Sequence, residues 1–503
     1  MYHKSIPVIA IFDVRINQEH MKIIFASLAI VAMLASCSSK PISGAEIDYD
    51  PDFNAGTVIN INTHQFVSKG YIGNGAQWDP YEAGPIGDAD WAKLYQRLDR
   101  MHPALIRVMM GTAFDEPGPD LLKILEYCQT RGIYVLYGDW GGSFVRNGAA
   151  NTENITKAVG NVEKLICDRG YDCIKEFIVV NEPNGSWSAT NCSFDLWSDV
   201  VKAFGSSVAK TRLAGKLKIA GPDAAVWSDK ETWWITREKN ELAQYTSLYN
   251  MHYYPGKEFV NSGEFSKMAR AYAAEVPSSS KIVLGEVGFK QTAEDGGGWY
   301  QEEAARRVAA DPYASAEDSQ MFVFDYFYGT DMADITFQVI NAGYSGCVAW
   351  MLDDAMHFKE KEKLKIWGFW NILGEEKYGA DKEQIRPWFY AWALVCRYIP
   401  NGCDIYTVRT SGNPAVKAVS CVKEGKRTIA LVNVSKDKAE KCEIRSDGFD
   451  GFNNVKKFVY NSGLEVKAEK DKLNPEEIIP GTDLEQGLQL EIGPETLIVL
   501  SEM

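Results

Sequence analysis

Between residues 56 and 400, short runs of apolar and β-branched residues alternate with segments in which apolar residues recur every three or four positions. A short apolar run is typical of a buried strand, and the longer spacing is typical of an amphipathic helix. Strands that alternate with helices usually form a parallel sheet, because each helix carries the chain back across the sheet. This alternation constrains the fold more than any other feature of the chain.

Eight strands can be placed in the alternation. Between the first two, the segment from Asp90 to Met101 puts Trp91, Leu94 and Leu98 on one side of a helix. Eight strands with intervening helices predict a (β/α)8 barrel, also called a TIM barrel. We expect the first strand to run up to residues 75–78. The other seven are expected to span 104–109, 133–137, 174–180, 217–221, 247–252, 281–284 and 346–351.

The pattern changes after residue 400. Apolar residues then alternate with polar ones at every second position, in segments such as 415–421, 428–434, 455–460 and 488–500. This period is typical of antiparallel strands, and the spacing fits a small C-terminal antiparallel β-sandwich. We therefore predict the barrel domain over residues 56–400 and a β-sandwich domain over residues 401–503.

The amino terminus has the order of a secretory signal. Met21 and Lys22 precede an apolar run that is too short to span a bilayer, and Leu34-Ala35-Ser36-Cys37 follows. The segment resembles the signal of bacterial lipoproteins, which implies cleavage before Cys37 and acylation of its amino terminus. Residues 1–36 are then an over-long start plus the signal peptide, and residues 37–55 are a tether. The expected location is the bacterial cell envelope, lipid-anchored in the outer membrane; the sequence leaves the periplasmic side or the cell surface open.

The composition excludes some partners. The formal net charge of −15 would repel nucleic acid and anionic membrane surfaces, so we expect membrane contact through the lipid anchor only. Nine cysteines besides Cys37 are scattered without the spacing of a zinc site. We expect no metal and no cofactor, and most of these thiols to be buried.

Two glutamates follow predicted strands. Glu182 stands after the fourth strand in Val180-Asn181-Glu182-Pro183, and Glu286 stands after the seventh in Leu284-Gly285-Glu286. In a (β/α)8 barrel the reactive groups lie at the carboxyl ends of the strands. Glycoside hydrolysis needs two carboxyl groups, one protonated and one ionised, and this pair can supply both.

The chain resembles the clan of retaining (β/α)8 glycoside hydrolases, and its motifs over residues 70–400 are similar to those of families 5, 30 and 39. The resemblance implies a carbohydrate substrate with a β-linkage, with Glu182 as acid/base and Glu286 as nucleophile. It also implies substrate-site roles at other strand ends. These residues are Asn181, which would contact the sugar 2-hydroxyl, Arg107 near the nucleophile, His252, Tyr254 as a donor to Glu286, and Trp350 under the cleaved sugar.

These neighbours have a physical purpose. A guanidinium and a phenol favour an ionised Glu286, whereas Glu182 must start each cycle protonated. We therefore expect less positive surroundings at Glu182, and carboxyl groups about 5 to 5.5 Å apart, as retention requires.

Further tryptophans follow other strands. Trp78, Trp140 and Trp187 are candidates for contact with a sugar, and the alternative for each is packing over the barrel end. Asp353 and Asp354 are expected to be solvated loop acids.

Two other classes of function were weighed. One is a catalytically inactive glycan-binding lipoprotein on a glycosidase-like barrel. The other is a barrel enzyme such as an aldolase, which the lack of a strand-end lysine disfavours. A monomer is expected. The sugar, its linkage and exo or endo action stay open.

Overall fold

The computed structural model describes residues 53–290, 298–359, 363–448, 452, 454–464, 473–479, 484 and 487–503. The predicted signal peptide, Cys37 and most of the tether lie outside these residues. None of the described helices is long and apolar enough to cross a membrane.

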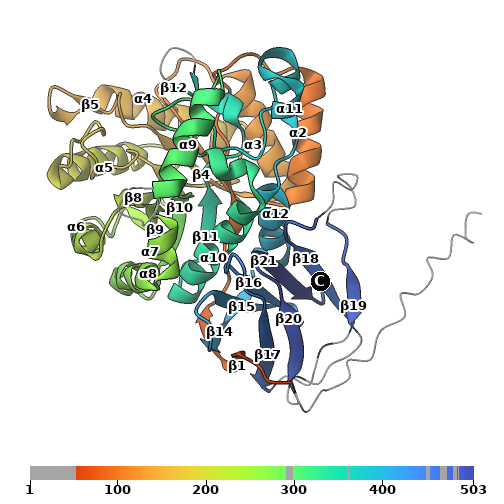
Figure 1. Ribbon diagram of the computed structural model, residues 1–503. Coiled ribbons are helices and arrows are strands. Elements are labelled where there is room, and N and C mark those ends of the chain that lie inside the picture. Colours follow the sequence, from red (N-terminus) through yellow and green to blue (C-terminus); the bar gives the residue numbers. More distant parts are fainter. Residues whose placement is uncertain are drawn as a thin grey trace, which may run out of the picture. The chain divides into compact units, whose positions relative to one another are not determined.

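Eight parallel strands close into a barrel, and all eight predicted strands are confirmed (Figure 1). Neighbouring strands pair in parallel all the way round, so their carboxyl ends meet at one mouth. In order round the barrel they are β2 (Gly73–Gln77), β3 (Leu105–Met110), β4 (Tyr134–Asp139), β7 (Ile174–Ile178), β8 (Lys218–Val226), β9 (Thr246–Tyr253), β10 (Lys281–Val287) and β11 (Gly346–Ala349).

Helices follow the strands. In α2 the residues Trp91, Leu94 and Leu98 are buried on one side, as the spacing predicts. The helix α3 begins at Pro119 and ends before Gly132, which adopts the left-handed conformation common after a last helical turn. The described helices include α2 (Asp88–Met101), α3 (Pro119–Arg131), α4 (Thr152–Glu163), α5 (Phe194–Val208), α6 (Trp233–Glu241), α7 (Lys257–Asn261), α8 (Glu264–Glu275), α9 (Gly298–Ala310), α10 (Tyr326–Ala342), α11 (Ala380–Glu383) and α12 (Trp388–Tyr398).

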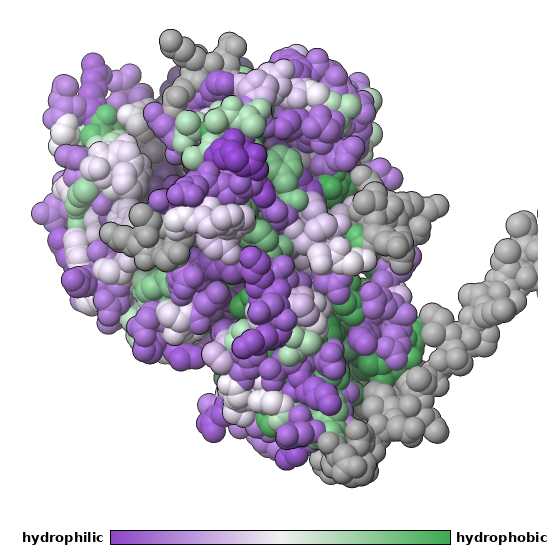
Figure 2. Space-filling view, in the orientation of Figure 1, coloured by the Kyte–Doolittle hydropathy of each residue, from purple (hydrophilic) through white to green (hydrophobic). Residues whose placement is uncertain are grey.

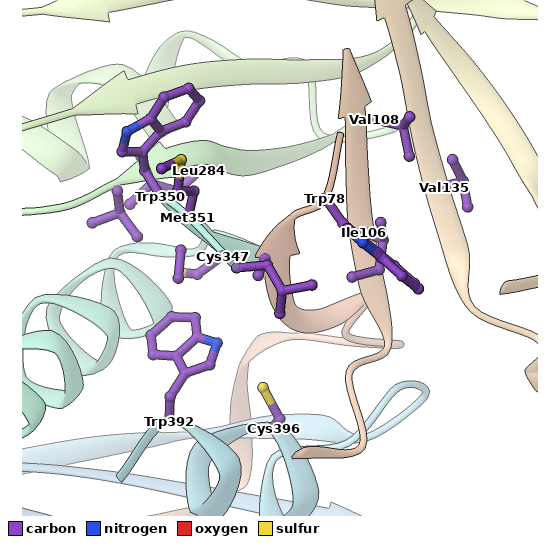
Figure 3. Close-up of a cluster of buried hydrophobic side chains, with 14 of the residues drawn as sticks. Trp78, Ile106, Val108, Val135, Leu284, Cys347, Trp350, Met351, Trp392 and Cys396 are labelled. Atoms are coloured by element: carbon purple, nitrogen blue, oxygen red, sulfur yellow. The ribbon is translucent and has the colours of Figure 1, made fainter. Parts of the chain in front are cut away.

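Alternate residues of the barrel strands form two cores. Leu105, Leu136 and Val283 belong to the cluster inside the barrel, whereas their neighbours Ile106 and Val135 belong to the cluster between barrel and helices. Figure 3 shows part of this outer layer, where Trp392 and Cys396 of α12 lie beneath Cys347. The indole of Trp392 also donates a hydrogen bond of 3.0 Å to the Gly75 carbonyl.

Nine further strands form a largely antiparallel sheet, which confirms the predicted barrel followed by a β-sandwich. Strands β20 and β21 are far apart in the strand order yet contact each other, so the sheet folds over onto itself. The order is β19 (Glu477–Ile479), β18 (Val455–Tyr460), β21 (Thr496–Ser501), β16 (Lys426–Asn433), β15 (Val416–Lys423), β14 (Asp404–Ser411), β1 (Thr57–Ser68), β17 (Glu440–Asp447) and β20 (Leu488–Ile492).

The strand β1 corrects the predicted boundary at residue 56. It pairs antiparallel with β14 and parallel with β17, so Thr57–Ser68 belongs to the sheet and not to the barrel. The cause lies in its period: Ile59 and Ile61 are buried in the sandwich core, whereas Asn60 between them is exposed. That alternation favours a half-buried antiparallel sheet over a barrel strand, which is buried on both faces.

The barrel and the sheet are joined by direct contacts. Asn341 of α10 donates a hydrogen bond of 2.9 Å to the Ala418 carbonyl, and the Tyr460 hydroxyl donates one of 2.8 Å to the Tyr326 carbonyl.

The face of the molecule shown in Figure 2 is mostly hydrophilic.

Candidate active site

Glu182 and Glu286 meet at the barrel mouth. Glu182 follows β7, and Glu286 is the penultimate residue of β10. His252, near the end of β9, lies between them, and one ligand atom from each of these three residues lies within 4.8 Å of the other two. The strand ends therefore bring together the two carboxyl groups that the sequence singles out.

The Glu286 carboxylate is buried and held by two donors. Arg107 donates from Nη1 to Oε1 at 2.5 Å, and the Tyr254 hydroxyl donates to Oε2 at 2.6 Å. Both contacts are those expected from the sequence. A guanidinium and a phenol, one at each oxygen, fix the orientation of the Glu286 carboxylate.

Glu182 contacts one histidine and one indole. Its Oε1 lies 3.0 Å from His252 Nδ1, and its Oε2 accepts a hydrogen bond of 2.7 Å from the Trp187 indole. Burial raises the pKa of Glu182, but the hydrogen bond and charge of His252 outweigh burial and lower it below its usual value. Because Arg107 contacts Glu286 and not Glu182, the surroundings of Glu182 are less positive than those of Glu286, as expected, although His252 faces both glutamates.

His252 carries a stable charge. Its buried ring also contacts Asp223 Oδ1 through Nε2 at 2.9 Å. Burial disfavours the imidazolium, but the nearby charges of Asp223 and Glu286 prevail and raise the pKa of His252 to about 10. The cluster of Glu182, His252 and Glu286 has the donor types of a metal site. Both ring nitrogens of His252 have a carboxylate partner, so these residues form a hydrogen-bonded ion cluster.

Asp223 was missed by the sequence analysis. It is buried in β8 and accepts hydrogen bonds from Arg107 Nη2 at 2.8 Å and from Asn250 Nδ2 at 2.5 Å. Burial raises the pKa of this carboxyl, but the charges of Arg107 and His252 prevail and lower it. A signal was available: an aspartate inside the apolar strand sequence Ile219-Ala220-Gly221-Pro222-Asp223-Ala224 needs a partner.

Arg107 ties the site together. The side chain is fully buried at the third residue of β3. Besides Glu286 and Asp223 it donates to Gln77 Oε1 at 2.7 Å and to Asn181 Oδ1 at 2.8 Å. It therefore orients the amide of Asn181, the residue expected to contact a sugar hydroxyl.

Trp350 and Trp140 both contact the ring of His357. The Trp350 ring stacks on the imidazole with an interplanar angle of 4°, and Trp140 meets it edge-on at 77°. His357 Nε2 lies 2.8 Å from Asp79 Oδ2. Burial disfavours the charged imidazole, but hydrogen bonds to Asp79 and Glu82 raise the pKa of His357 to about 9. Trp140, Trp350 and the charged ring of His357 together form an aromatic wall.

Trp78 is not part of this wall, and its prediction as a substrate-binding residue is corrected. The side chain has no exposed surface and packs against Trp91 and Tyr127. Gln77 and Asp79, its neighbours in sequence, carry the polar contacts of the site instead. Successive side chains of a strand point to opposite faces, so the three cannot all face the mouth.

Asp353 and Asp354 are buried, not solvated as expected. Asp354 forms an ion pair with Arg386, and Asp353 accepts a hydrogen bond of 2.8 Å from the Trp370 indole. Both acids therefore fix the long connection after β11 that carries His357.

Comparisons with known proteins agree with this architecture. No protein-family model matches the chain, and no curated protein matches it in sequence. Solved structures do match. A glycoside hydrolase family 30 subfamily 8 xylanase from Clostridium acetobutylicum has a TM-score of 0.57 at 14% identity, over 88% of this chain and 98% of that one.

Two other solved structures are similar to the same extent. An α-L-arabinofuranosidase from Thermotoga maritima has a TM-score of 0.58 at 13% identity, over 88% of this chain and 99% of that one. A family 39 enzyme from Xanthomonas axonopodis pv. citri has a TM-score of 0.56 at 11% identity, over 88% and 96%. At this identity the likeness establishes a shared fold, a (β/α)8 barrel with an accompanying β-domain.

Proposed function

We propose that the chain is a retaining glycoside hydrolase that cleaves a β-glycosidic bond by double displacement. The observation that carries the proposal is the pair of carboxyl groups at the barrel mouth, Glu182 and Glu286, which lie close together in different surroundings. Similar solved structures are described as a xylanase, an α-L-arabinofuranosidase and a β-xylosidase, which supports a carbohydrate substrate.

The contacts of Glu286 suit the role of nucleophile. Glu286 is held by Arg107 and Tyr254 as an ionised nucleophile. Its oxygen attacks the anomeric carbon while Glu182 gives its proton to the leaving oxygen, and the glycosidic bond breaks. In the second step Glu182 takes a proton from water, and the water oxygen replaces the Glu286 ester at the anomeric carbon.

The spacing favours retention. One carboxylate oxygen of Glu182 lies within 4.8 Å of one carboxylate oxygen of Glu286. An inverting enzyme needs about 6.5 to 9.5 Å between its carboxyl groups to seat a water molecule, whereas a retaining enzyme needs about 5 to 5.5 Å.

The test is a screen of aryl glycosides and polysaccharides, with β-xylosides, β-glucosides and α-L-arabinofuranosides among them. Glu286→Ala should lose at least about 10⁴-fold in kcat on any substrate found. Glu176→Gln is the matched control, because Glu176 is a buried glutamate on β7 whose partners are Tyr134 and Ser247. Wild-type turnover by Glu286→Ala would refute the nucleophile. Sugar binding without any hydrolysis would favour the inactive glycan-binding alternative.

We also propose that the protein is a lipid-anchored, monomeric enzyme of the bacterial cell envelope. The support is the sequence before Cys37, with its apolar run and small residues. Expressed from the full chain, the protein should partition into the membrane fraction, and Cys37→Ser should release it. Equal partitioning of both forms would contradict the anchor.

A further inference from the structure

Two exposed tryptophans stand beside Glu182. Trp187 and Trp227 leave 61% and 58% of their surface exposed. Their ring centres are 5.6 Å apart and their planes meet at 81°, so the two indoles form a corner. Large aromatic surfaces left open in this way often mark a binding site.

The corner contacts Glu182, the proposed acid/base, and not Glu286, the proposed nucleophile. The Trp187 indole donates a hydrogen bond of 2.7 Å to Glu182 Oε2, whereas Oε1 faces His252 and, beyond it, Glu286. In double displacement the acid/base gives its proton to the leaving oxygen. A ring attached to that oxygen must therefore lie beside Glu182, on the side of these indoles.

The two loops that carry the indoles are fixed to each other. Asn184, in the loop after β7, donates from Nδ2 to the Ala225 carbonyl at 2.6 Å and accepts from the Ala225 amide at 2.9 Å. Trp227 follows Ala225 by two residues, directly after β8. The corner is therefore held in place before a ligand arrives, which lowers the entropy lost on binding.

A glycine allows the indole to reach the carboxylate. A Cβ added at Gly185 would lie 2.4 Å from the Trp187 ring, closer than atoms can approach. Only glycine at this position lets the indole fold back over the loop towards Glu182.

We infer that Trp187 and Trp227 bind the leaving group of the substrate, and that this leaving group is itself a ring, either a further sugar or an aromatic aglycone. The C–H face of a sugar or the face of an aryl ring packs on one indole while the other closes the side. This inference rests on the proposed function and specifies its substrate class.

The test compares two substrates of the sugar that the screen identifies. The 4-methylumbelliferyl glycoside has a ring in its leaving group, and the glycosyl fluoride has none. Trp227→Ala should lower kcat/KM on the umbelliferyl glycoside by about three- to tenfold, the size of one lost stacking contact. On the fluoride the change should stay within about twofold. Trp227→Tyr, which keeps a ring, should restore most of the loss.

Trp299→Ala is the control, because Trp299 of α9 is 55% exposed and packs against Tyr300 and Phe322. It should change neither rate. Equal losses on both substrates, or no loss on either, would overturn the inference. Inactivity of the wild type on both substrates, or full activity of Glu286→Ala, would instead refute the proposed hydrolase function.

Discussion

His252 lies between the two glutamates, with Nδ1 3.0 Å from Glu182 Oε1 and 3.6 Å from Glu286 Oε2. The same ring contacts Asp223 through Nε2. One imidazolium therefore neutralises part of the charge of three carboxylates, among them both glutamates that would do the chemistry.

This position predicts how activity depends on pH. In the free enzyme the acid/base must be protonated, so kcat/KM should fall as pH rises through the pKa of Glu182, which His252 lowers. His252→Asn removes the positive charge, so the pKa of Glu182 should rise and the basic limb of the profile should move to higher pH. His357→Asn, which alters a buried histidine paired with Asp79, is the control. A basic limb that stays in place in His252→Asn would contradict this account.

Much of the barrel and of the site could be predicted from sequence, because strand runs, strand ends and paired glutamates are local patterns. Glu286 follows from those patterns, whereas the contacts of Arg107 and Tyr254 with it were expected from the resemblance to the glycoside hydrolase clan. The contacts of His252 with Glu182 and Asp223 do not, since they depend on how three strands pack side by side. The sequence does not show which of Gln77, Trp78 and Asp79 point into the site and which point into the core. A shift of one residue along a strand moves each side chain to the opposite face, so this choice needs the structure.

Trp78 and Trp140 should therefore respond differently to substitution. Trp78→Ala empties part of the core, and the free energy of unfolding should fall by about 3–5 kcal/mol while kcat/KM of the folded enzyme changes little. Trp140→Ala should instead lower kcat/KM with a smaller loss of stability, because this ring is partly exposed beside His357. Urea unfolding and initial rates measure both. A large loss of kcat/KM in folded Trp78→Ala would return Trp78 to the substrate site.

Arg107 should be required for stability as well as for activity. Arg107→Met leaves Asp223 and Glu286 buried without their shared cation, and removal of one partner from a buried ion pair costs about 3–5 kcal/mol. The loss should be smaller at pH 4 than at pH 7, because the orphaned carboxyls can then take up protons. Arg212→Met is the control: Arg212 also pairs with two acids, but its side chain is 55% exposed. Such a pair contributes about 0–1 kcal/mol. Equal losses in the two variants would contradict the prediction.

Glu238 of α6 predicts a pH dependence that is separate from the site. Its side chain is fully buried, its Oε1 accepts a hydrogen bond of 2.8 Å from Thr246, and burial raises its pKa to about 8. A carboxyl whose pKa is higher in the folded than in the unfolded state stabilises the fold below its usual pKa of 4.5. That stabilisation is lost as pH rises towards 8. Glu238→Gln keeps the shape and the acceptor but cannot ionise.

Wild type and Glu238→Gln should therefore have similar free energies of unfolding near pH 4. As pH approaches 8, the free energy of unfolding of the variant should become larger than that of the wild type. The difference should be on the order of a few kcal/mol, because each unit of pKa shift corresponds to about 1.4 kcal/mol. Glu126→Gln, at an exposed position of α3, is the control: the difference between its free energy of unfolding and that of the wild type should be the same at every pH. If the difference for Glu238→Gln were also the same at every pH, Glu238 would have to titrate near its usual value in the folded protein, and water or a local opening would have to reach its second oxygen.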